Sequence, residues 1–218
     1  MAKNWTLGHR LLLALGLLTA ADLLLLILRF LLTGSSRYSF IPANLTLAWL
    51  SLLFAWLLVK GLDKSRWMSW PNIGLTVLWL LFLPNTWYVL TDFIHVAPNG
   101  EISQLFDIVL IWLLVFVGFA LGVASLFLVH RQLLARRGLA DSWLFIETAI
   151  LLSSFAIYVG RDLRWNSWDI IANPTGLLAN VVDPFGNPRA LNVTLLFLIL
   201  INATYGAFWI MTYQSKHR

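Results

Sequence analysis

The chain has 218 residues, of which 60% are hydrophobic and only 11% are charged. Because a water-soluble domain carries roughly 25% charged residues, this composition predicts a chain that lies mostly in lipid. The absence of cysteine excludes disulfides, thiolate metal ligands and thiol catalysis. The net charge of +5 does not indicate a nucleic-acid partner, because the basic residues fall in short connections between apolar segments. The partner that the composition predicts is the lipid bilayer.

Apolar segments of spanning length recur along the chain. A span needs about 20 residues to cross about 30 Å of hydrocarbon. We therefore expect an all-α, polytopic transmembrane helical bundle that forms a single integral membrane domain over residues 1–218. The first apolar run continues to Leu32 without a clear cleavage site, so it is interpreted as a retained span and not as a signal peptide. The expected spans are 11–32, 44–59, 73–90, 105–130, 142–160 and 190–213, with a long outer loop at 161–189.

The third expected span contains a proline. Its apolar run stops at Leu83, which is too short to cross, so the helix must continue through Pro84 and Asn85. Because a proline inside a helix removes a backbone hydrogen bond, we expect this helix to be kinked at Pro84.

The Lys and Arg residues predict the orientation. Basic residues favour the cytoplasmic side, and most of those in this chain fall on one side of the expected spans. The connection 91–104 has no Lys or Arg, as expected on the outer side. We therefore expect both termini inside. The inner residues are Lys3, Arg10, Lys60, Lys64, Arg66, Arg131, Arg136, Arg137, Lys216 and Arg218, and the outer ones are Arg29, Arg37, Arg161, Arg164 and Arg189.

Two polar stripes lie at the expected outer side. If the third span stays helical, Asn85, Tyr88, Asp92 and His95 share one face, because they are spaced three, four and three residues apart. After the fifth span, the segment 160–174 holds two each of Arg, Asp, Trp and Asn. In a helix its polar residues also form one face, with the arginines and tryptophans on the adjoining face. That segment contributes Arg161, Asp162, Arg164, Trp165, Asn166, Trp168, Asp169 and Asn173.

Asp107 and Arg29 are expected at the same depth as these stripes, so that four segments converge on one site. As candidates for acid–base catalysis or for metal ligation we take Asp92, His95, Asp107 and Asp169. The candidates for ligand binding are Asn85, Tyr88, Arg161, Asp162, Arg164, Trp165, Asn166 and Trp168. A structural interpretation stands beside this one, since charged groups at helix ends often reach water or pair there, and tryptophans at this depth serve as anchors.

Two carboxylates lie deeper. Asp22 is near the middle of the first span, and Glu147 is about a turn and a half into the fifth. A lone ionised carboxylate at the bilayer centre costs about 2.5 kcal/mol or more, so each needs a partner, water or a proton. Asn202 in the sixth span is a candidate partner for either. Glu147 is thus a further catalytic candidate, with a purely structural role as the alternative.

The blocks LPNTWYVLTDFIHV and GRDLRWNSWDIIANP together resemble the domain-of-unknown-function 1361 family of bacterial multi-spanning membrane proteins. The resemblance covers the chain from the second span to the sixth. It implies a multi-pass protein of the bacterial cytoplasmic membrane with no assigned activity, and it identifies no cofactor. The matching residues are Pro84, Asn85, Tyr88, Thr91, Asp92 and His95, and Gly160, Arg161, Arg164, Trp165, Asn166, Ser167, Trp168 and Asp169.

Three functions fit these patterns, in descending order of preference. In the first, Arg161 and Arg164 bind an anionic lipid head group or a lipid-linked envelope precursor. In the second, the site is a membrane-embedded hydrolase or transferase, with or without a metal, although no known catalytic spacing is present. In the third, the chain transports an ion or small solute past its interrupted third helix. The pair Gly118 and Gly122 predicts a close helix contact within or between chains, so the oligomeric state is left open.

Overall fold

The computed structural model describes residues 7–98, 100–163 and 187–213. All regular secondary structure in these ranges is helical, which confirms the predicted fold class. The helices are α1 (Leu7–Thr33), α2 (Ile41–Lys64), α3 (Trp70–Phe82), α4 (Asn85–Tyr88), the 3-10 helix η1 (Val89–His95), α5 (Gln104–Arg137), α6 (Leu139–Asp162) and α9 (Pro188–Tyr213).

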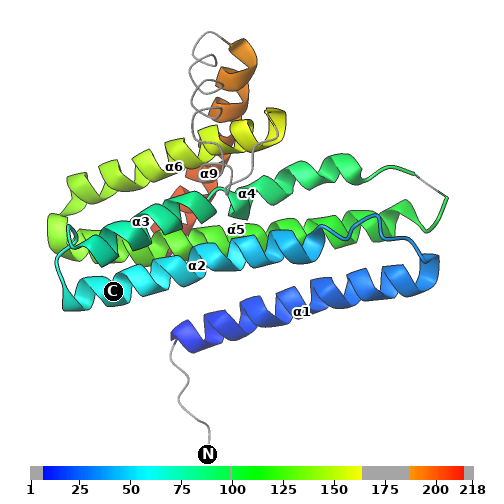
Figure 1. The fold of residues 1–218 in the computed structure, drawn as a ribbon, viewed down its shortest axis with the longest axis horizontal. Coiled ribbons are helices and arrows are strands. Elements are labelled where there is room, and N and C mark those ends of the chain that lie inside the picture. The colour runs from blue at the N-terminus through cyan, green and yellow to red at the C-terminus, as the bar shows by residue number, and fades with distance from the viewer. Residues whose placement is uncertain (1–6, 99, 164–186, 214–218) are drawn as a thin grey trace, which may run out of the picture.

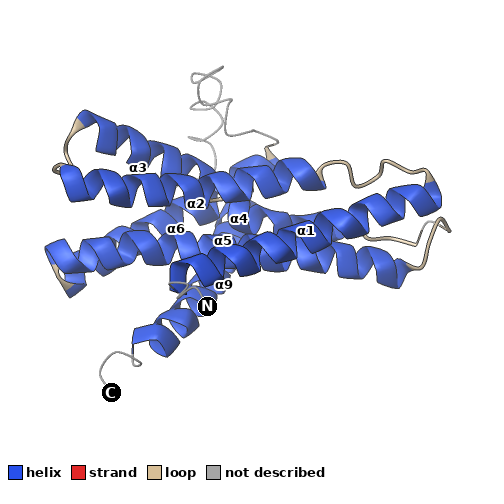
Figure 2. Cartoon of the chain, turned by 90° about the horizontal axis from the view of Figure 1, so that it is seen from below, coloured by secondary structure: helices blue, strands red, loops and turns tan. Residues whose placement is uncertain are grey.

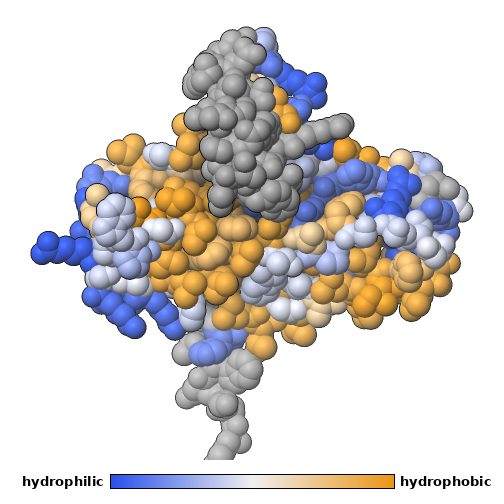
Figure 3. Space-filling view, in the orientation of Figure 1, coloured by the Kyte–Doolittle hydropathy of each residue, from blue (hydrophilic) through white to orange (hydrophobic). Residues whose placement is uncertain are grey.

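Within the described residues, six helical stretches are long and apolar enough to cross a membrane. The third of them, Trp70–His95, combines α3, α4 and η1. Large apolar side chains cover the outside of the bundle, and on α1 Leu17, Leu24 and Leu31 are 71%, 65% and 73% exposed. Figure 3 shows this apolar surface over the middle of the molecule, with hydrophilic residues gathered toward its ends. Such a surface is stable in lipid and unfavourable in water, so the chain is a multi-pass membrane protein.

The longest helix, α5, lies at the centre of the bundle. It contacts α1, α2, the α4–η1 segment, α6 and α9. In Figures 1 and 2, α1 lies along one edge of the bundle, and α9 crosses the other helices obliquely. We call the end at which α1, η1 and α6 finish the outer end, after the orientation that the sequence predicts. The inner end, at the left of Figure 1, is where α2 and α5 finish and α3 and α6 begin.

Pro84 marks a change in the third span. The α-helix α3 ends at Phe82, and a single α-helical turn, α4, follows from Asn85. The chain then winds as a 3-10 helix from Val89 to His95. The expected α-helix over the first polar stripe is therefore wrong in its last part. Tightening to i→i+3 hydrogen bonds is common at helix ends. Since a 3-10 helix has three residues per turn, Asp92 and His95 still lie on one face.

Gly118 and Gly122 allow α5 to contact this interrupted span closely. A Cβ atom at Gly118 would lie 2.6 Å from the carbonyl oxygen of Thr86, and one at Gly122 would lie 2.7 Å from the indole of Trp87. These distances are shorter than van der Waals contact, so a side chain at either position would displace α4. The close contact that the spacing of the two glycines predicts is made within the chain.

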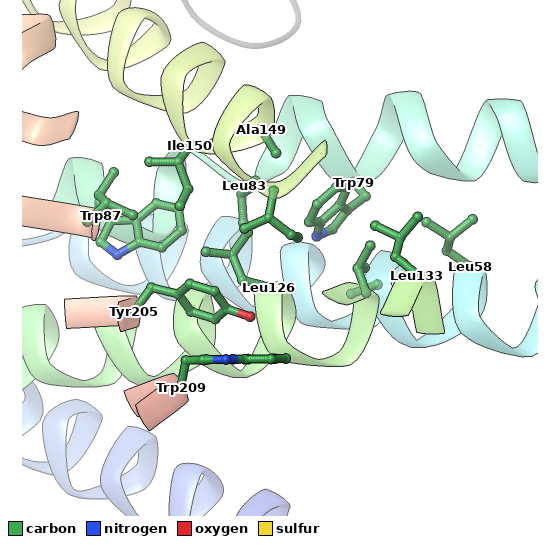
Figure 4. Packing of buried hydrophobic residues seen from close by; sticks show 14 of the residues in the cluster. Leu58, Trp79, Leu83, Trp87, Leu126, Leu133, Ala149, Ile150, Tyr205 and Trp209 are labelled. Atoms are coloured by element: carbon green, nitrogen blue, oxygen red, sulfur yellow. The ribbon is translucent and has the colours of Figure 1, made fainter. Parts of the chain in front are cut away.

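A buried cluster of aromatic and aliphatic side chains joins five of the spans. Figure 4 shows side chains from α2, α3, α4, α5, α6 and α9 that point toward one another, including Trp79, Trp87 and Tyr205. Polar groups inside the bundle pair across helices: the indole nitrogen of Trp79 donates to Ser125 Oγ at 2.7 Å. Toward the inner end, Nδ1 of the buried His130 lies 2.7 Å from the hydroxyl of Tyr205. These contacts hold α3 and α9 to α5.

Candidate functional site

A buried ion pair joins α1 and α5 at the outer end. Nε of Arg29 donates to Asp107 at 2.7 Å, and both side chains are 1% exposed. A second guanidinium nitrogen, Nη2, donates to Glu101 at 2.9 Å, whereas Nη1 is buried and has no hydrogen-bond partner among the described residues. The prediction that Arg29 and Asp107 lie at the same depth is confirmed by this contact.

Tyr38, in the connection between α1 and α2, completes this network. Its hydroxyl lies 3.0 Å from Asp107 Oδ2 and 3.1 Å from the carbonyl oxygen of His95. Its ring also lies under the Arg29 guanidinium, with 4.6 Å between the Cζ atom and the ring centroid. Burial and the hydrogen bond to Asp107 raise the pKa of Tyr38 to about 12. Tyr38 therefore links α5 to the end of η1.

A second polar group is built around Asp92 and Arg161. Asn44 of α2 donates to Asp92 Oδ2 at 2.7 Å, and Asp92 is 5% exposed. Arg161, half-buried at the end of α6, donates to the carbonyl oxygen of Thr91 at 3.4 Å. It also interacts electrostatically with Asp92 and His95. This group thus joins the start of α2, η1 and the end of α6.

The remaining residues of the first stripe have different surroundings. The imidazole of His95 is exposed and packs against Phe40, with 5.1 Å between the ring centroids. Asn85 is half-buried, and its side-chain nitrogen donates to the carbonyl oxygen of Phe82 in the preceding turn. Tyr88 is half-buried and interacts electrostatically with Arg161. Tyr88 and His95 therefore lie beside the Asp92–Arg161 group, and Asn85 supports the chain near Pro84.

The second stripe is described only at its start. Asp162 forms an ion pair with Arg189, with 2.7 Å between Oδ1 and Nη2, which joins the end of α6 to the start of α9. The candidates Arg164, Trp165, Asn166, Trp168 and Asp169 lie outside the described residues.

The metal candidates Asp92, His95 and Asp107 do not form one group. Within the described residues, no three His, Asp or Glu side chains lie close enough together to hold a metal ion. Asp107 is engaged by Arg29 and Tyr38, and Asp92 by Asn44. Since Asp169 falls outside the described part of the chain, the metal site stays a prediction.

The deep carboxylates are not joined to this site by any contact among described residues. Asp22 is fully buried, and both its oxygens are without a hydrogen-bond partner there. Glu147 is half-buried in α6. Among the described residues, Asn202 makes no hydrogen bond to either carboxylate, and its side-chain nitrogen donates to the carbonyl oxygen of Leu198 in its own helix.

Sequence reasoning missed three groups of the outer end, namely Tyr38, Asn44 and Glu101. Each lies in a connection or in the first turn of a helix, where no periodic pattern marks it. For Glu101 the sequence did hold a signal. It is an acidic residue close in sequence to Asp107, and Arg29, the lone basic residue of the first span, is predicted at the depth of Asp107. Tyr38 and Asn44 have no such signal.

The helices and their surface define the chain as a polytopic α-helical membrane protein with polar groups gathered at the ends of its spans. The sequence profile described as protein of unknown function (DUF1361) matches residues 43–204. The chain therefore belongs to the DUF1361 family. No curated protein and no solved structure matches the chain. Family membership confirms the resemblance found in the two sequence blocks and assigns no reaction.

Proposed function

We propose that the protein binds the anionic head group of a lipid, or of a lipid-linked envelope precursor, at its outer end, with Arg161 as the anchor. One observation carries the proposal. A guanidinium has five N–H donors, and the only hydrogen bond of Arg161 to a described residue is the one of 3.4 Å to Thr91. A half-buried guanidinium with several donors that no described residue engages is suited to bind a phosphate or carboxylate through two parallel hydrogen bonds.

The groups beside Arg161 suit the uncharged part of such a ligand. Asp92 Oδ1 makes no hydrogen bond to a described residue, so it is available to accept one from a sugar or glycerol hydroxyl. Tyr88 and His95 interact electrostatically with Arg161 and supply further donors and acceptors. The proposal extends to Arg164, Trp165, Asn166 and Trp168 on their sequence pattern alone.

Arg29 is a poorer anchor than Arg161, although it lies at the same end. Its guanidinium is engaged by Asp107 and Glu101, and it is 1% exposed. A ligand would have to displace two carboxylates to reach it, at the cost of leaving Asp107 buried without its partner. The site is therefore assigned to the α6 side of the bundle.

The proposal includes the location of the protein. We place it in the cytoplasmic membrane of a bacterium, as the resemblance of its two sequence blocks implies. The gathering of Lys and Arg at one side of the spans supports the orientation with both termini inside. The ligand would then reach Arg161 from the outer leaflet.

The test is a titration of the detergent-solubilised full chain with short-chain phosphatidic acid, followed by tryptophan fluorescence. Arg161→Gln should weaken binding by about 10- to 100-fold, because a charge-assisted hydrogen bond contributes roughly 1.5–3 kcal/mol. The matched control is Arg189→Gln, at the same end, whose side chain is 75% exposed and paired with Asp162. Unchanged affinity in Arg161→Gln, or an equal loss in both variants, would contradict the proposal.

A second candidate is an enzyme that acts on the same lipid. It is favoured by Asp92, a carboxylate that is 5% exposed and oriented by Asn44, with one oxygen available beside Arg161. Such a group could act as a general base. Incubation of the wild type with short-chain phosphatidic acid, analysed by mass spectrometry, decides between the two. Product that disappears in Asp92→Asn identifies an enzyme, and unaltered lipid supports binding alone.

A further inference from the structure

A groove of about 420 Å³ opens at the inner end, where three parts of the chain meet. Trp67 lines it from the connection before α3, Leu133 and Arg137 from the end of α5, and Asp141 from the start of α6. Two aromatic side chains line it: the ring of Phe145 packs edge-on against Trp67, with 5.3 Å between the centroids. The groove therefore combines aromatic side chains with charged groups.

Two opposite charges line this groove without pairing. Arg137 and Asp141 are both exposed. Within the described residues, neither makes an ion pair or side-chain hydrogen bond, with each other or with another group. Neighbouring charges at the same end behave differently, since Asp63 accepts from Gln132 at 2.9 Å and pairs with Arg136 at 3.9 Å. The groove thus offers to a ligand one cation and one anion that no described residue pairs with.

We propose that this groove binds a glycerophospholipid whose head group carries both a phosphate and a primary ammonium. Arg137 would donate to the phosphate through two parallel hydrogen bonds. The ammonium has three N–H donors, and Asp141 would accept from it. A head group with a phosphate alone leaves Asp141 unpaired and close to a like charge. A quaternary ammonium has no N–H to donate.

The surface below the groove suits the acyl chains of such a lipid. Leu144 lines the groove and is 70% exposed. Leu151 and Leu152, seven and eight residues further along α6, are 47% and 51% exposed. This spacing puts all three on one face of the helix. Glu147 and Thr148 lie between them on the same face, so the apolar side chains flank one polar turn on the way from the groove toward the middle of the span. With the predicted orientation, Trp67 would lie at the level of the inner head groups, where tryptophan is enriched.

The experiment compares three short-chain lipids that share a glycerophosphate and differ in the head group: phosphatidylethanolamine, phosphatidylglycerol and phosphatidylcholine. Binding to the detergent-solubilised full chain is measured in an Arg161→Gln background, so that the site proposed at the outer end does not contribute. We expect phosphatidylethanolamine to bind tightest. Arg137→Gln should lower the affinity for all three lipids by at least about fivefold, as expected for one basic contact at a membrane surface.

Asp141→Asn gives the decisive result. This substitution should weaken the binding of phosphatidylethanolamine by about fivefold or more. The affinity for phosphatidylglycerol should stay unchanged or rise, because the repulsion between Asp141 and the phosphate is removed. Asp141→Glu keeps the charge and should keep the preference. The matched control is Arg131→Gln, since Arg131 lies over the Phe127 ring and does not line the groove, and it should change nothing.

Two results would overturn the proposal. One is phosphatidylglycerol as the tightest ligand of the wild-type groove. The other is an equal response of all three lipids to Asp141→Asn. Circular dichroism of each variant separates loss of binding from loss of fold, and both charged side chains are exposed, so we expect the helical content to be unchanged.

Discussion

Arg29 and Asp107 bring opposite charges into contact at 2.7 Å inside the bundle, where each is 1% exposed. Removing one partner of a buried pair leaves the other charge desolvated, which costs about 3–5 kcal/mol. We therefore expect Asp107→Asn and Arg29→Gln each to lower the free energy of unfolding by about that amount. Thermal and denaturant unfolding of the detergent-solubilised protein measure the change.

Glu101 provides the control for this prediction. It contacts the same guanidinium at 2.9 Å, but its side chain is 37% exposed, and exposed pairs contribute about 0–1 kcal/mol. Glu101→Gln should therefore have a small effect. If it destabilises the protein as much as Asp107→Asn, burial is not the cause. The double variant Arg29→Met with Asp107→Leu should recover much of the loss.

The raised pKa of Tyr38 predicts how stability depends on alkaline pH. The value rises from 10.0 to about 12 in the folded protein. Below the lower value the hydroxyl is protonated in both states, and its contribution to stability is fully present. Between the two values it ionises only in the unfolded state, so stability falls as pH rises through this window. Unfolding midpoints in Tyr38→Phe should fall less steeply there than in the wild type, since the other tyrosines contribute equally to both. If the unfolding midpoints of Tyr38→Phe and the wild type fell in parallel as the pH rises, the raised pKa of Tyr38 would be contradicted.

The sequence predicts which of these polar residues share a depth and leaves open which of them touch. Arg29 and Asp107 could be placed at one level because span lengths convert residue number into height. Their contact also depends on how α1 is rotated against α5, which side-chain packing decides. Tyr38 and Asn44 could not be predicted for another reason. Residues in connections and first turns follow no helical period.

The contact between α4 and α5 depends on two glycines, so it can be tested by substituting each glycine with alanine, which adds a Cβ atom. At Gly118 a Cβ would lie 2.6 Å from the backbone oxygen of Thr86, so α4 would have to shift. Overpacking of this kind costs typically about 1–3 kcal/mol. We expect Gly118→Ala and Gly122→Ala to lower the unfolding midpoint in detergent, and to alter the outer end through the displacement of η1.

Gly74 is the matched control because it lies inside α3 with nothing within 4 Å of an added Cβ. Gly74→Ala should be neutral, or should stabilise by up to about 1 kcal/mol through a lower entropy of the unfolded chain. Equal destabilisation at positions 74 and 118 would mean that the close approach of α4 is not the cause.

At the level of the elements, the spans could be predicted and the end of the third could not. Apolar runs of about 20 residues have few alternatives to a helix in lipid. Five of the six predicted segments each lie within one helix, and the third, 73–90, runs through α3, the turn at 83–84, α4 and the start of η1. The 3-10 winding of Val89–His95 differs from an α-helix by small changes in ψ. Contacts from Tyr38 to the His95 carbonyl and from Asn44 to Asp92 hold it there, and no local pattern reveals such contacts in advance.

For the whole molecule, the distribution of Lys and Arg predicts that both termini lie inside. The natural sequence has no cysteine, so single cysteines can be introduced without background labelling. Ser36 lies in the exposed connection between α1 and α2, and Met68, 76% exposed, lies in the connection between α2 and α3. In intact cells, a membrane-impermeant maleimide should label Ser36→Cys and not Met68→Cys. After permeabilisation it should label both.

The labelling result bears on both proposed sites because they lie at opposite ends of the spans. With the predicted orientation, Arg161 faces lipids of the outer leaflet, and the groove beside Arg137 faces lipids of the inner leaflet. The reverse pattern, with Met68→Cys labelled in intact cells, would contradict the positive-inside prediction and exchange the two lipid pools. The detergent titrations do not depend on orientation, since both ends are then open to solution. Binding with reversed labelling would therefore keep the two sites and change the membrane surface on which each one works.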